Sequence, residues 1–149
     1  MVAFFDYIVI GAGSAGCVIA NRLSQDSKIK VCLIETGPMN KHPLMKIPLG
    51  LIFLIKNKKY NWLFNSIPQK HCNNRTIKIP RGKVLGGSSS INGMVYIRGH
   101  EEDFNSWSRN GCYGWDYKSI LPYFKRSESN MNITMDKNVH GYNGELSVS

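Results

Sequence analysis

The chain has 149 residues, of which 42% are hydrophobic and 19% are charged. This composition excludes a disordered chain and is sufficient for one ordinary domain with its own core. The formal net charge is +9, but the lysines are scattered and no run of five or six like charges occurs. The sequence therefore predicts a solvated basic surface and no nucleic-acid site.

Neither a secretion signal nor a membrane span is predicted. Residues 1–5 lack a charged start and lead directly into a strand pattern, so we expect no signal peptide. The longest apolar run, residues 49–55, is far shorter than the roughly 20 residues that a membrane-spanning helix needs. Lysines flank this run, so peripheral membrane contact stays open beside the interpretation that we favour, a buried segment. We expect a cytoplasmic protein, with association at a membrane surface as the alternative.

The four cysteines form no C-x-x-C pair, which argues against a zinc ribbon or a redox dithiol. No metal site is predicted. Cys17 and Cys32 fall inside apolar stretches and are expected as small core residues.

The amino-terminal residues predict a strand, a helix and a second strand. Residues 7–10 are continuously apolar, which is typical of a strand buried on both faces of a parallel sheet. After a glycine-rich turn, apolar residues recur at spacings of three and four on one helical face, namely Ala15, Val18, Ile19 and Leu23. Residues 29–35 predict the second strand. These elements form a βαβ unit, whose crossover should be right-handed.

The turn before the helix carries a dinucleotide-binding pattern, Gly11-x-Gly13-x-x-Gly16. Gly11 permits a tight turn, Gly13 lets a pyrophosphate approach the backbone, and Gly16 lets the helix pack closely on the strand. The amino end of the helix presents free N–H groups to the phosphates. Glu35, at the end of the second strand, is placed to accept hydrogen bonds from ribose hydroxyls and would repel a ribose phosphate. FAD and NAD both carry an ADP half, so this pattern alone leaves both open.

Beyond residue 37 the regular alternation of elements ends. Residues 38–80 hold five of the six prolines and predict an excursion of short elements. A helix is predicted to begin near residues 101–103, because acidic side chains favour a helix amino end. It would carry Phe104 and Trp107 on one side.

A second helix is expected after Asp116, which would act as its cap. Pro122 would bend or restart this helix. Its inward-facing residues would be Tyr117, Ile120, Leu121 and Phe124. Residues 145–149 look like the start of a further strand.

A second glycine-rich segment occupies residues 81–99. Two adjacent glycines followed by three serines, at residues 86–90, predict a loop with many free N–H and hydroxyl groups. Such loops form anion-binding concavities, and Arg81 or Lys83 would add positive charge nearby. The turn at residues 92–93 is expected to face a ligand with its backbone amides.

This segment resembles the first signature of the glucose–methanol–choline (GMC) oxidoreductases. The matching residues are Gly82, Leu85, Gly86, Gly87, Ser88, Ser89, Ile91, Asn92, Tyr96, Gly99 and Asn105. Further matching motifs are Asp6-Tyr7-Ile8-Val9, Tyr60-Asn61-Trp62, Asn73-Asn74-Arg75, Asp103-Phe104-x-x-Trp107, Gly114-Trp115 and Leu121-Pro122-Tyr123-Phe124. The resemblance covers nearly all of the chain. It looks closest to the choline dehydrogenase branch, in which the run Asn92-Gly93-Met94-x-Tyr96-Ile97-Arg98-Gly99 is familiar.

The resemblance implies an α/β fold, namely an incomplete Rossmann-like βαβ FAD-binding domain of GMC type with short excursions and helices. Residues 1–149 would be the amino-terminal part of this domain, and the substrate-binding domain would be largely absent. A half-built parallel sheet leaves edges and an apolar face exposed. We therefore expect the chain to fold poorly or aggregate unless the remaining part of the enzyme covers it.

The resemblance also implies FAD, bound in an extended form. The residues assigned to the pyrophosphate are Gly11, Gly13, Ser14, Ala15 and Gly16, with Glu35 at the adenosine ribose. Val84 would lie near the adenine end, and Gly86, Gly87, Ser88 and Ser89 would line the middle. The residues assigned to the isoalloxazine ring are Asn92, Gly93, Met94 and Val95, with Trp62 close by. Ile91 stands where some members tether FAD through a histidine, so non-covalent FAD is expected.

The reaction that the resemblance implies is oxidation of the CH–OH group of a small alcohol, as in choline dehydrogenases, with hydride transfer from the alcohol carbon to flavin N5. The family's catalytic base is a histidine near the carboxyl end of a much longer chain. None of the four histidines here, His42, His71, His100 and His140, stands in that motif. No catalytic residue is therefore assigned, and the chain alone is expected to be inactive.

Two other functions stay open. A non-catalytic module would keep FAD or ADP as a structural ligand, and the missing catalytic histidine favours it for the chain as given. An NAD-linked enzyme is the other, but it has no need of residues 82–99. The substrate (choline, another amino alcohol, an aliphatic alcohol or a sugar) and the electron acceptor (oxygen or a quinone) are not readable from these residues.

Overall fold

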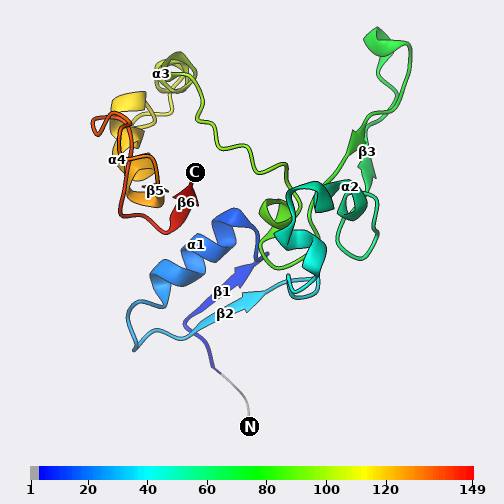
Figure 1. Cartoon of the computed structure of the whole chain (residues 1–149), viewed down its shortest axis with the longest axis horizontal. Coiled ribbons are helices and arrows are strands. Elements are labelled where there is room, and N and C mark those ends of the chain that lie inside the picture. The colour runs from blue at the N-terminus through cyan, green and yellow to red at the C-terminus, as the bar shows by residue number, and fades with distance from the viewer. Residues whose placement is uncertain (1–3) are drawn as a thin grey trace. The chain divides into compact units, whose positions relative to one another are not determined.

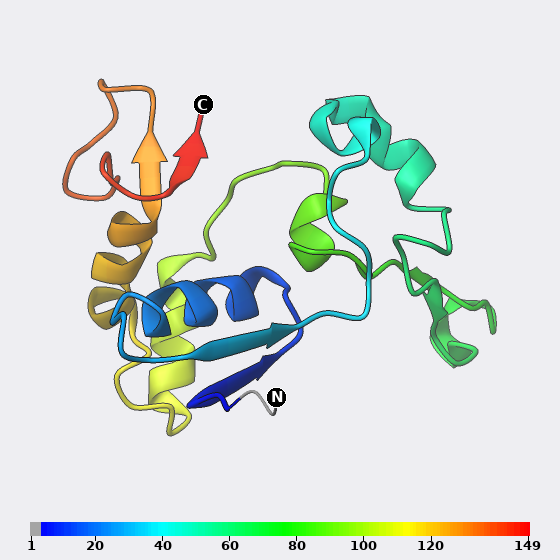
Figure 2. The same cartoon turned by 90° about the horizontal axis from the view of Figure 1, so that it is seen from below.

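The computed structural model describes residues 4–149, and the chain divides into two compact units at Val95–Tyr96. Unit 1 comprises the residues up to Val95, and unit 2 comprises Tyr96–Ser149. Each unit is described by itself. Figures 1 and 2 show the elements of both units.

Unit 1 begins with the predicted βαβ motif. Strand β1 (Tyr7–Ile10) leads into helix α1 (Ser14–Leu23), and strand β2 (Val31–Ile34) follows. The two strands pair in parallel with Tyr7 opposite Val31 and Ile10 opposite Ile34. Helix α1 packs along this strand pair (Figures 1 and 2), as the spacing of its apolar residues predicts.

The prediction that the first strand is buried on both faces is wrong for the described structure. Ile10 is 84% exposed, and Ile8 is also exposed. The reason is that β1 and β2 form a sheet of only two strands, which α1 packs against. A parallel strand is buried on both faces only when further strands and a second helical layer are present. Cys17 and Cys32, predicted as core residues, are likewise only half-buried.

The excursion of short elements predicted for residues 38–80 is confirmed. Its elements are η1 (Pro43–Lys46), η2 (Pro48–Gly50), α2 (Leu51–Leu54), β3 (Phe64–Asn65), η3 (Lys70–Cys72) and β4 (Lys78–Ile79). Strands β3 and β4 form an antiparallel pair with Phe64 opposite Ile79. A further single-turn element, η4 (Gly87–Ser90), lies in the second glycine-rich segment.

The apolar run at residues 49–55 is only partly buried, which corrects our favoured interpretation of it. Leu54 is buried, but Phe53 is 66% exposed, and Leu49 and Ile52 are exposed as well. A helix of one turn directs only one side toward the core, so neighbouring apolar residues point to solvent. Within residues 4–149, no helix is long and apolar enough to cross a membrane.

The core of unit 1 is formed by the side chains of Leu54, Tyr60, Val84 and Ile91. Asn61 is buried beside it and makes three hydrogen bonds to backbone. Its Nδ2 donates to the Ile55 carbonyl at 2.6 Å, and its Oδ1 accepts from the amides of Leu63 at 3.0 Å and Arg81 at 2.9 Å. This asparagine therefore ties the excursion to the start of the second glycine-rich segment.

Unit 2 contains the two predicted helices, α3 (Glu101–Arg109) and α4 (Tyr117–Ser127). Asp116 caps α4 as predicted, accepting a hydrogen bond from the Ser119 amide at 3.0 Å. The Phe104 ring packs against the rings of Trp107 and Phe124 at centroid distances of 5.3 and 5.6 Å. These contacts form an aromatic cluster in which Phe104 is buried and Trp107 is exposed.

Pro122 does not restart α4, contrary to one of the expected outcomes. The helix runs continuously from Tyr117 to Ser127 with Pro122 inside it. Proline cannot donate a hydrogen bond to the carbonyl four residues earlier, and its ring crowds that carbonyl. That residue, Lys118, is exposed to solvent, so water can satisfy its carbonyl.

Unit 2 ends in a parallel strand pair, β5 (Glu128–Asn130) and β6 (Leu146–Val148). The predicted strand at residues 145–149 corresponds to β6, whereas β5 was not predicted.

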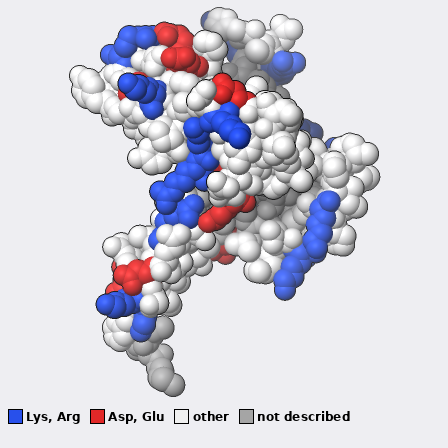
Figure 3. All heavy atoms as spheres, turned by 60° about the vertical axis from the view of Figure 1, so that its left-hand side comes forward, with Lys and Arg blue, Asp and Glu red and all other residues white. Residues whose placement is uncertain are grey.

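On the face drawn in Figure 3, Lys and Arg side chains lie in separate groups, some with Asp or Glu beside them.

Candidate functional site

The glycine turn between β1 and α1 leaves several backbone N–H groups without protein partners. Gly11 has a φ of +91°, a conformation that favours glycine, and Gly13 is the cap residue of α1. Within the described residues, the amides of Gly13, Ser14 and Ala15 donate to no protein acceptor. A Cβ atom built on Gly11 or Gly13 would meet nothing within 4 Å. The turn is therefore an open cradle lined by free N–H donors, which suits a phosphate.

Gly16 has a packing role that differs from the role of Gly13. A Cβ atom on Gly16 would lie 1.9 Å from the Gly11 carbonyl oxygen and 3.4 Å from the side chain of Val9. The third glycine of the pattern thus lets α1 approach the strand end, as the sequence predicts.

Glu35 connects the glycine turn to the end of β2. Its Oε2 accepts a hydrogen bond from the Ala12 amide at 2.8 Å, and its Oε1 accepts one from the Gly37 amide at 2.9 Å. A carboxylate has about four acceptor positions, so both oxygens keep capacity for a ligand hydroxyl. Glu35 therefore shapes the turn and also borders the open space beside it.

The second glycine-rich loop packs directly on the first. The Gly86 amide donates to the Ala12 carbonyl at 2.7 Å. Gly87, with a φ of +58°, approaches so closely that a Cβ atom on it would lie 2.8 Å from the Gly13 Cα. A side chain at Gly87 would require movement of the backbone, whereas a Cβ atom on Gly86 would lie 2.2 Å from the Ser90 hydroxyl. The two loops, more than 70 residues apart in sequence, thus form one surface.

Serine hydroxyls strengthen this contact between the loops. The Oγ atoms of Ser14 and Ser89 are hydrogen bonded to each other, and the Gly82 amide donates to Ser88 Oγ at 3.0 Å. The serines that follow the double glycine therefore bond both to the first loop and to the start of their own segment.

A groove of about 910 Å³ runs between the two loops. Its lining residues are Val9, Ile10, Gly11, Gly13, Ser14, Ala15, Gly16, Ile19, Glu35, Thr36, Trp62, Phe64, Ile79, Arg81, Gly82, Gly87 and Ser88. At one side Trp62 stacks on Phe64 with ring centroids 5.8 Å apart, and Lys83 Nζ lies 4.9 Å from the Trp62 ring centroid. The groove therefore combines free backbone N–H groups, one carboxylate, one guanidinium and a flat aromatic wall.

Nine of the sixteen predicted cofactor-binding residues line this groove. They are Gly11, Gly13, Ser14, Ala15, Gly16, Glu35, Trp62, Gly87 and Ser88. Gly86 and Ser89 lie outside the lining but hold the two loops together. Val84, placed near the adenine by resemblance, is fully buried in the core of unit 1, so its side chain packs against protein.

The four residues predicted at the flavin ring lie apart from the groove lining. Asn92 and Met94 border a separate small cavity of about 60 Å³. Gly93 is exposed and Val95 is 81% exposed. The Met94 backbone has a φ of +57°, which is uncommon for a residue with a side chain. The described structure thus presents this segment to solvent.

None of the four histidines is among the residues that line the groove. His42 Nδ1 accepts a hydrogen bond from the Leu44 amide at 3.2 Å, and His100 Nδ1 accepts one from the Glu102 amide at the same distance. These two residues cap η1 and α3. His71 is exposed, and His140 contacts Glu128.

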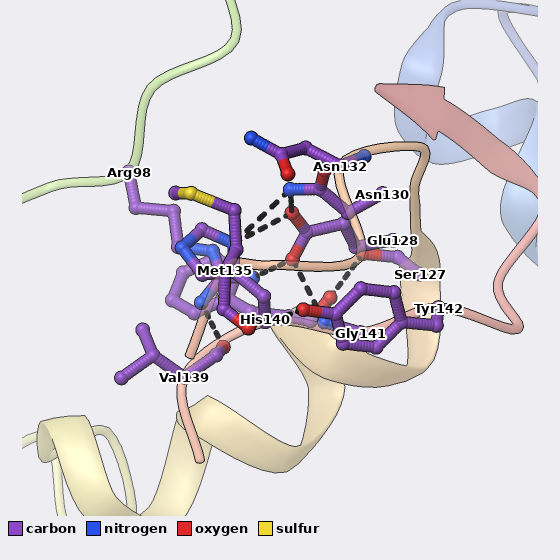
Figure 4. A network of polar contacts seen from close by, with 11 residues as sticks. Arg98, Ser127, Glu128, Asn130, Asn132, Met135, Val139, His140, Gly141 and Tyr142 are labelled. Carbon is purple, nitrogen blue, oxygen red and sulfur yellow. Dashed lines mark hydrogen bonds and ion pairs between the residues drawn. The ribbon is translucent and has the colours of Figure 1, made fainter. Parts of the chain in front are cut away.

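Sequence reasoning missed two sets of residues. A Cβ atom on Gly37 would lie 2.1 Å from the Lys83 carbonyl, so this glycine lets the end of β2 meet the second loop. It was interpreted only as a break between elements. The other set surrounds Glu128 (Figure 4), a buried carboxylate that contacts Arg98 and His140. No local pattern connects these three positions, because they lie 30 and 12 residues apart.

Burial alone would raise the pKa of Glu128. The hydrogen bonds from His140, Gly141 and Asn130 and the charge of Arg98 outweigh it and lower this pKa from 4.5 to about 2. Glu128 is therefore ionised at neutral pH.

A strand, a glycine turn, a helix and a second strand ending in a carboxylate define a dinucleotide-binding protein. A family model described as "GMC oxidoreductase" matches residues 5–148. The chain belongs to the GMC oxidoreductase family, in which this region is the amino-terminal FAD-binding domain. This membership confirms the resemblance stated from the sequence, and it implies a flavin cofactor.

The chain is similar to an "Alcohol dehydrogenase [acceptor]" of Pseudomonas putida, with 53% identity over 145 residues, 97% of this chain and 26% of that protein. It is similar to an "Oxygen-dependent choline dehydrogenase" of Sinorhizobium fredii, with 53% identity over 123 residues, 83% of this chain and 22% of that protein. Among solved structures it resembles pyridoxine 4-oxidase from Mesorbium loti, with a TM-score of 0.88, 32% identity, and coverage of 97% of this chain and 28% of that chain. The chain thus spans about a quarter of the length of these relatives.

Proposed function

We propose that this chain is the amino-terminal part of the FAD-binding domain of an enzyme that oxidises the CH–OH group of a small alcohol. The observation that carries this proposal is the groove between the two glycine loops. Free amides at one loop, the packed second loop and the Glu35 carboxylate meet there. The family and the alcohol and choline dehydrogenase relatives support the choice of reaction.

The residues present fit an ADP-containing cofactor. The open space over Gly13 and the free amides of Ser14 and Ala15 suit a diphosphate, which needs both close approach and N–H donors. Glu35 keeps acceptor capacity for ribose hydroxyls and would repel a ribose phosphate. We assign the pyrophosphate to the first loop and the ribose to Glu35.

We assign the flavin half of the cofactor to Trp62 and residues 92–95, and the middle of the cofactor to Gly86–Ser89. Val84 is assigned to the adenine end. The flavin would supply N5 as hydride acceptor for alcohol oxidation. The chain's own residues bind and orient it, and none of the four histidines stands in the family's catalytic motif. We therefore assign no catalytic residue, and we expect the chain alone to be inactive.

Non-covalent attachment of FAD is part of the proposal. Ile91 has no nucleophilic atom and is buried in the core of unit 1. Acid precipitation of the loaded protein should release all yellow colour into the supernatant. Colour that stays with the washed precipitate would contradict this assignment.

The experiment that tests the proposed reaction uses the flavin absorption band. The full chain, loaded with FAD and mixed with a polypeptide covering the remaining length of a relative, should lose this band when choline or another primary alcohol is added without oxygen. The chain without that polypeptide should keep it. A bound flavin that no alcohol reduces in either sample would favour the alternative, a non-catalytic FAD- or ADP-binding module.

Peripheral membrane contact is a second proposal, favoured by the exposure of the apolar run. Leu49 and Phe53 are exposed, lysines flank them, and no acidic residue occurs between Glu35 and Glu101. Exposed apolar and basic side chains together suit an anionic lipid surface. The chain should float with vesicles containing anionic lipid, and Phe53→Ser should reduce this flotation. Absence of flotation would contradict membrane contact, and equal flotation with neutral vesicles would contradict the contribution of the basic side chains.

A further inference from the structure

Asparagine is followed directly by glycine at three places in the chain, and such pairs are chemically labile. Glycine has no Cβ atom to keep its backbone nitrogen away from the side-chain amide of the asparagine before it. The three pairs are Asn92-Gly93, Asn110-Gly111 and Asn143-Gly144. All three asparagines are exposed. Neither sequence nor exposure therefore distinguishes them, and any difference must come from the hydrogen bonds around each pair.

The glycine amides of two of these pairs, both in unit 2, are occupied. The Gly111 amide donates to the Ser108 carbonyl at 3.1 Å, and the Gly144 amide donates to the Glu128 carbonyl at 2.9 Å. Gly144 is also tightly packed, since a Cβ atom on it would lie 2.2 Å from the Ser127 backbone. A nitrogen held in this way must give up its hydrogen bond before it can react.

The Gly93 amide, in unit 1, is free to react. Within the described part of the chain it donates to no protein acceptor, and Gly93 itself is exposed. A Cβ atom built on Gly93 would meet nothing within 4 Å, so the space around this residue is open. The Gly93 nitrogen can therefore approach the side chain of Asn92 without breaking a hydrogen bond to protein.

The side chain of Asn92 is prepared for attack by this nitrogen. Its Oδ1 accepts a hydrogen bond from the Met94 amide at 3.0 Å. Attack at Cγ develops negative charge on Oδ1, and a donor that is already in place stabilises this charge. In Asn110, by contrast, Nδ2 donates to the Ser106 carbonyl at 2.8 Å, which holds the group that would have to leave.

We propose that Asn92 is a site of spontaneous covalent modification, at which attack by the Gly93 nitrogen converts the side-chain amide into a carboxylate. The contacts that favour Asn92 all lie within unit 1. The inference goes beyond the proposed function and does not depend on it.

The reaction needs only water. The Gly93 nitrogen forms a bond to Asn92 Cγ and gives up its proton to water, while the bond between Cγ and Nδ2 breaks and Nδ2 leaves as ammonia. Water then opens the resulting cyclic imide at one of its two carbonyl carbons. The product is aspartate, or its isomer in which the main chain runs through the side-chain carbon. In sum, one water is consumed, one ammonia is released, and nothing is oxidised or reduced.

The test follows the three asparagines in one sample of the dilute full chain. The chain is incubated in mildly alkaline buffer enriched in the heavy isotope of oxygen, and its peptides are analysed by mass spectrometry at intervals. We expect Asn92 to convert on the order of tenfold faster than Asn110 and Asn143, the rate effect of one hydrogen bond that must first be broken. In concentrated urea the three sites should convert at similar rates, because the hydrogen bonds that protect two of them are then lost.

Gly93→Ala is the matched variant. The open space at this position accommodates the methyl group in the fold, but the methyl group hinders the approach of the nitrogen to Asn92 Cγ. Conversion of Asn92 should become several-fold slower in this variant, and conversion of Asn110 and Asn143 should not change.

Three results would overturn the proposal. The first is conversion of Asn92 in the native chain no faster than that of Asn110 or Asn143. The second is an equally strong preference for Asn92 in urea, which would mean that the fold does not set it. The third is undiminished conversion of Asn92 in Gly93→Ala, which would exclude attack by the glycine nitrogen.

Discussion

Glu35 illustrates how one side chain can serve both the fold and a ligand. The sequence places it at the end of the second strand and assigns it to ribose. The structure adds that it accepts hydrogen bonds from the amides of Ala12 and Gly37, so that it shapes the turn. This second role was not predictable, because it depends on how the turn folds back on the strand end.

A neutral amide at this position should weaken both roles. In Glu35→Gln one of the two backbone donors would face the side-chain NH₂ group instead of an oxygen. We expect the free energy of unfolding to fall by about 1–3 kcal/mol, with weaker binding of ADP. Urea unfolding and titration calorimetry measure the two effects. Glu101→Gln, on exposed α3, is the control, and equal behaviour of the two variants would contradict the role of Glu35.

Glu128 gives the chain a defined dependence on acid pH. Its pKa in the folded chain is about 2, below its usual 4.5. The ionised group therefore stabilises the fold above about pH 4.5, and this stabilisation is lost as the pH falls from there through about 2. Other carboxylates titrate in the same window, so the difference between native chain and Glu128→Gln isolates this one.

We expect the native free energy of unfolding to fall more steeply than that of Glu128→Gln across this acid window. Urea unfolding monitored by circular dichroism at successive pH values provides the measurement. Parallel pH profiles for the two proteins would show that Glu128 is not the group responsible.

At the scale of elements, the glycines of the two loops have separable roles. Gly13 borders open space and has an ordinary backbone conformation, with φ −78°. Gly87 combines a positive φ with backbone contact to the first loop. An added methyl group should therefore disturb the ligand in one case and the protein in the other.

Gly13→Ala should unfold at nearly the same urea concentration as the native chain but lose most of its affinity for ADP and FAD. Gly87→Ala should lose about 1–3 kcal/mol of stability from the strained φ and bind more weakly as a consequence. Urea unfolding and titration calorimetry distinguish the two. Undiminished ADP binding by Gly13→Ala would mean that the diphosphate does not lie over this turn.

The elements that sequence analysis predicted are those with local signals. β1, α1 and β2 follow from apolar periodicity and the glycine turn, and α3 and α4 follow from acidic or capping residues at their amino ends. β5 was missed because Glu128–Asn130 is polar and pairs with Leu146–Val148 only through a long loop. Val84 was placed near the adenine by the family resemblance alone. The structure adds that its side chain packs in the core of unit 1.

At the scale of the whole molecule, the exposed apolar surface is the dominant feature. β1 and β2 pair only with each other in the described structure, and side chains such as Ile8 and Ile10 are exposed. Unpaired strand edges and exposed apolar side chains promote association with other chains. The remaining part of the enzyme is the partner that we propose for this surface.

Without that partner the chain should self-associate. We expect its apparent mass in size-exclusion chromatography with light scattering to rise with protein concentration, and Ile8→Lys to reduce the rise. Ser27→Lys adds the same charge at an exposed site outside the two strands and should not reduce it. A native chain that stays monomeric at every concentration would contradict this view of the sheet.

The central claim is that the two glycine loops together form a site for FAD. Its most direct test is titration of the full chain with FAD, followed by competition with ADP and with NAD. We predict uptake of one FAD per chain, displacement of FAD by excess ADP, and weaker binding of NAD than of FAD, because NAD lacks the flavin half. Failure of the folded chain to bind FAD, or tighter binding of NAD than of FAD, would contradict it.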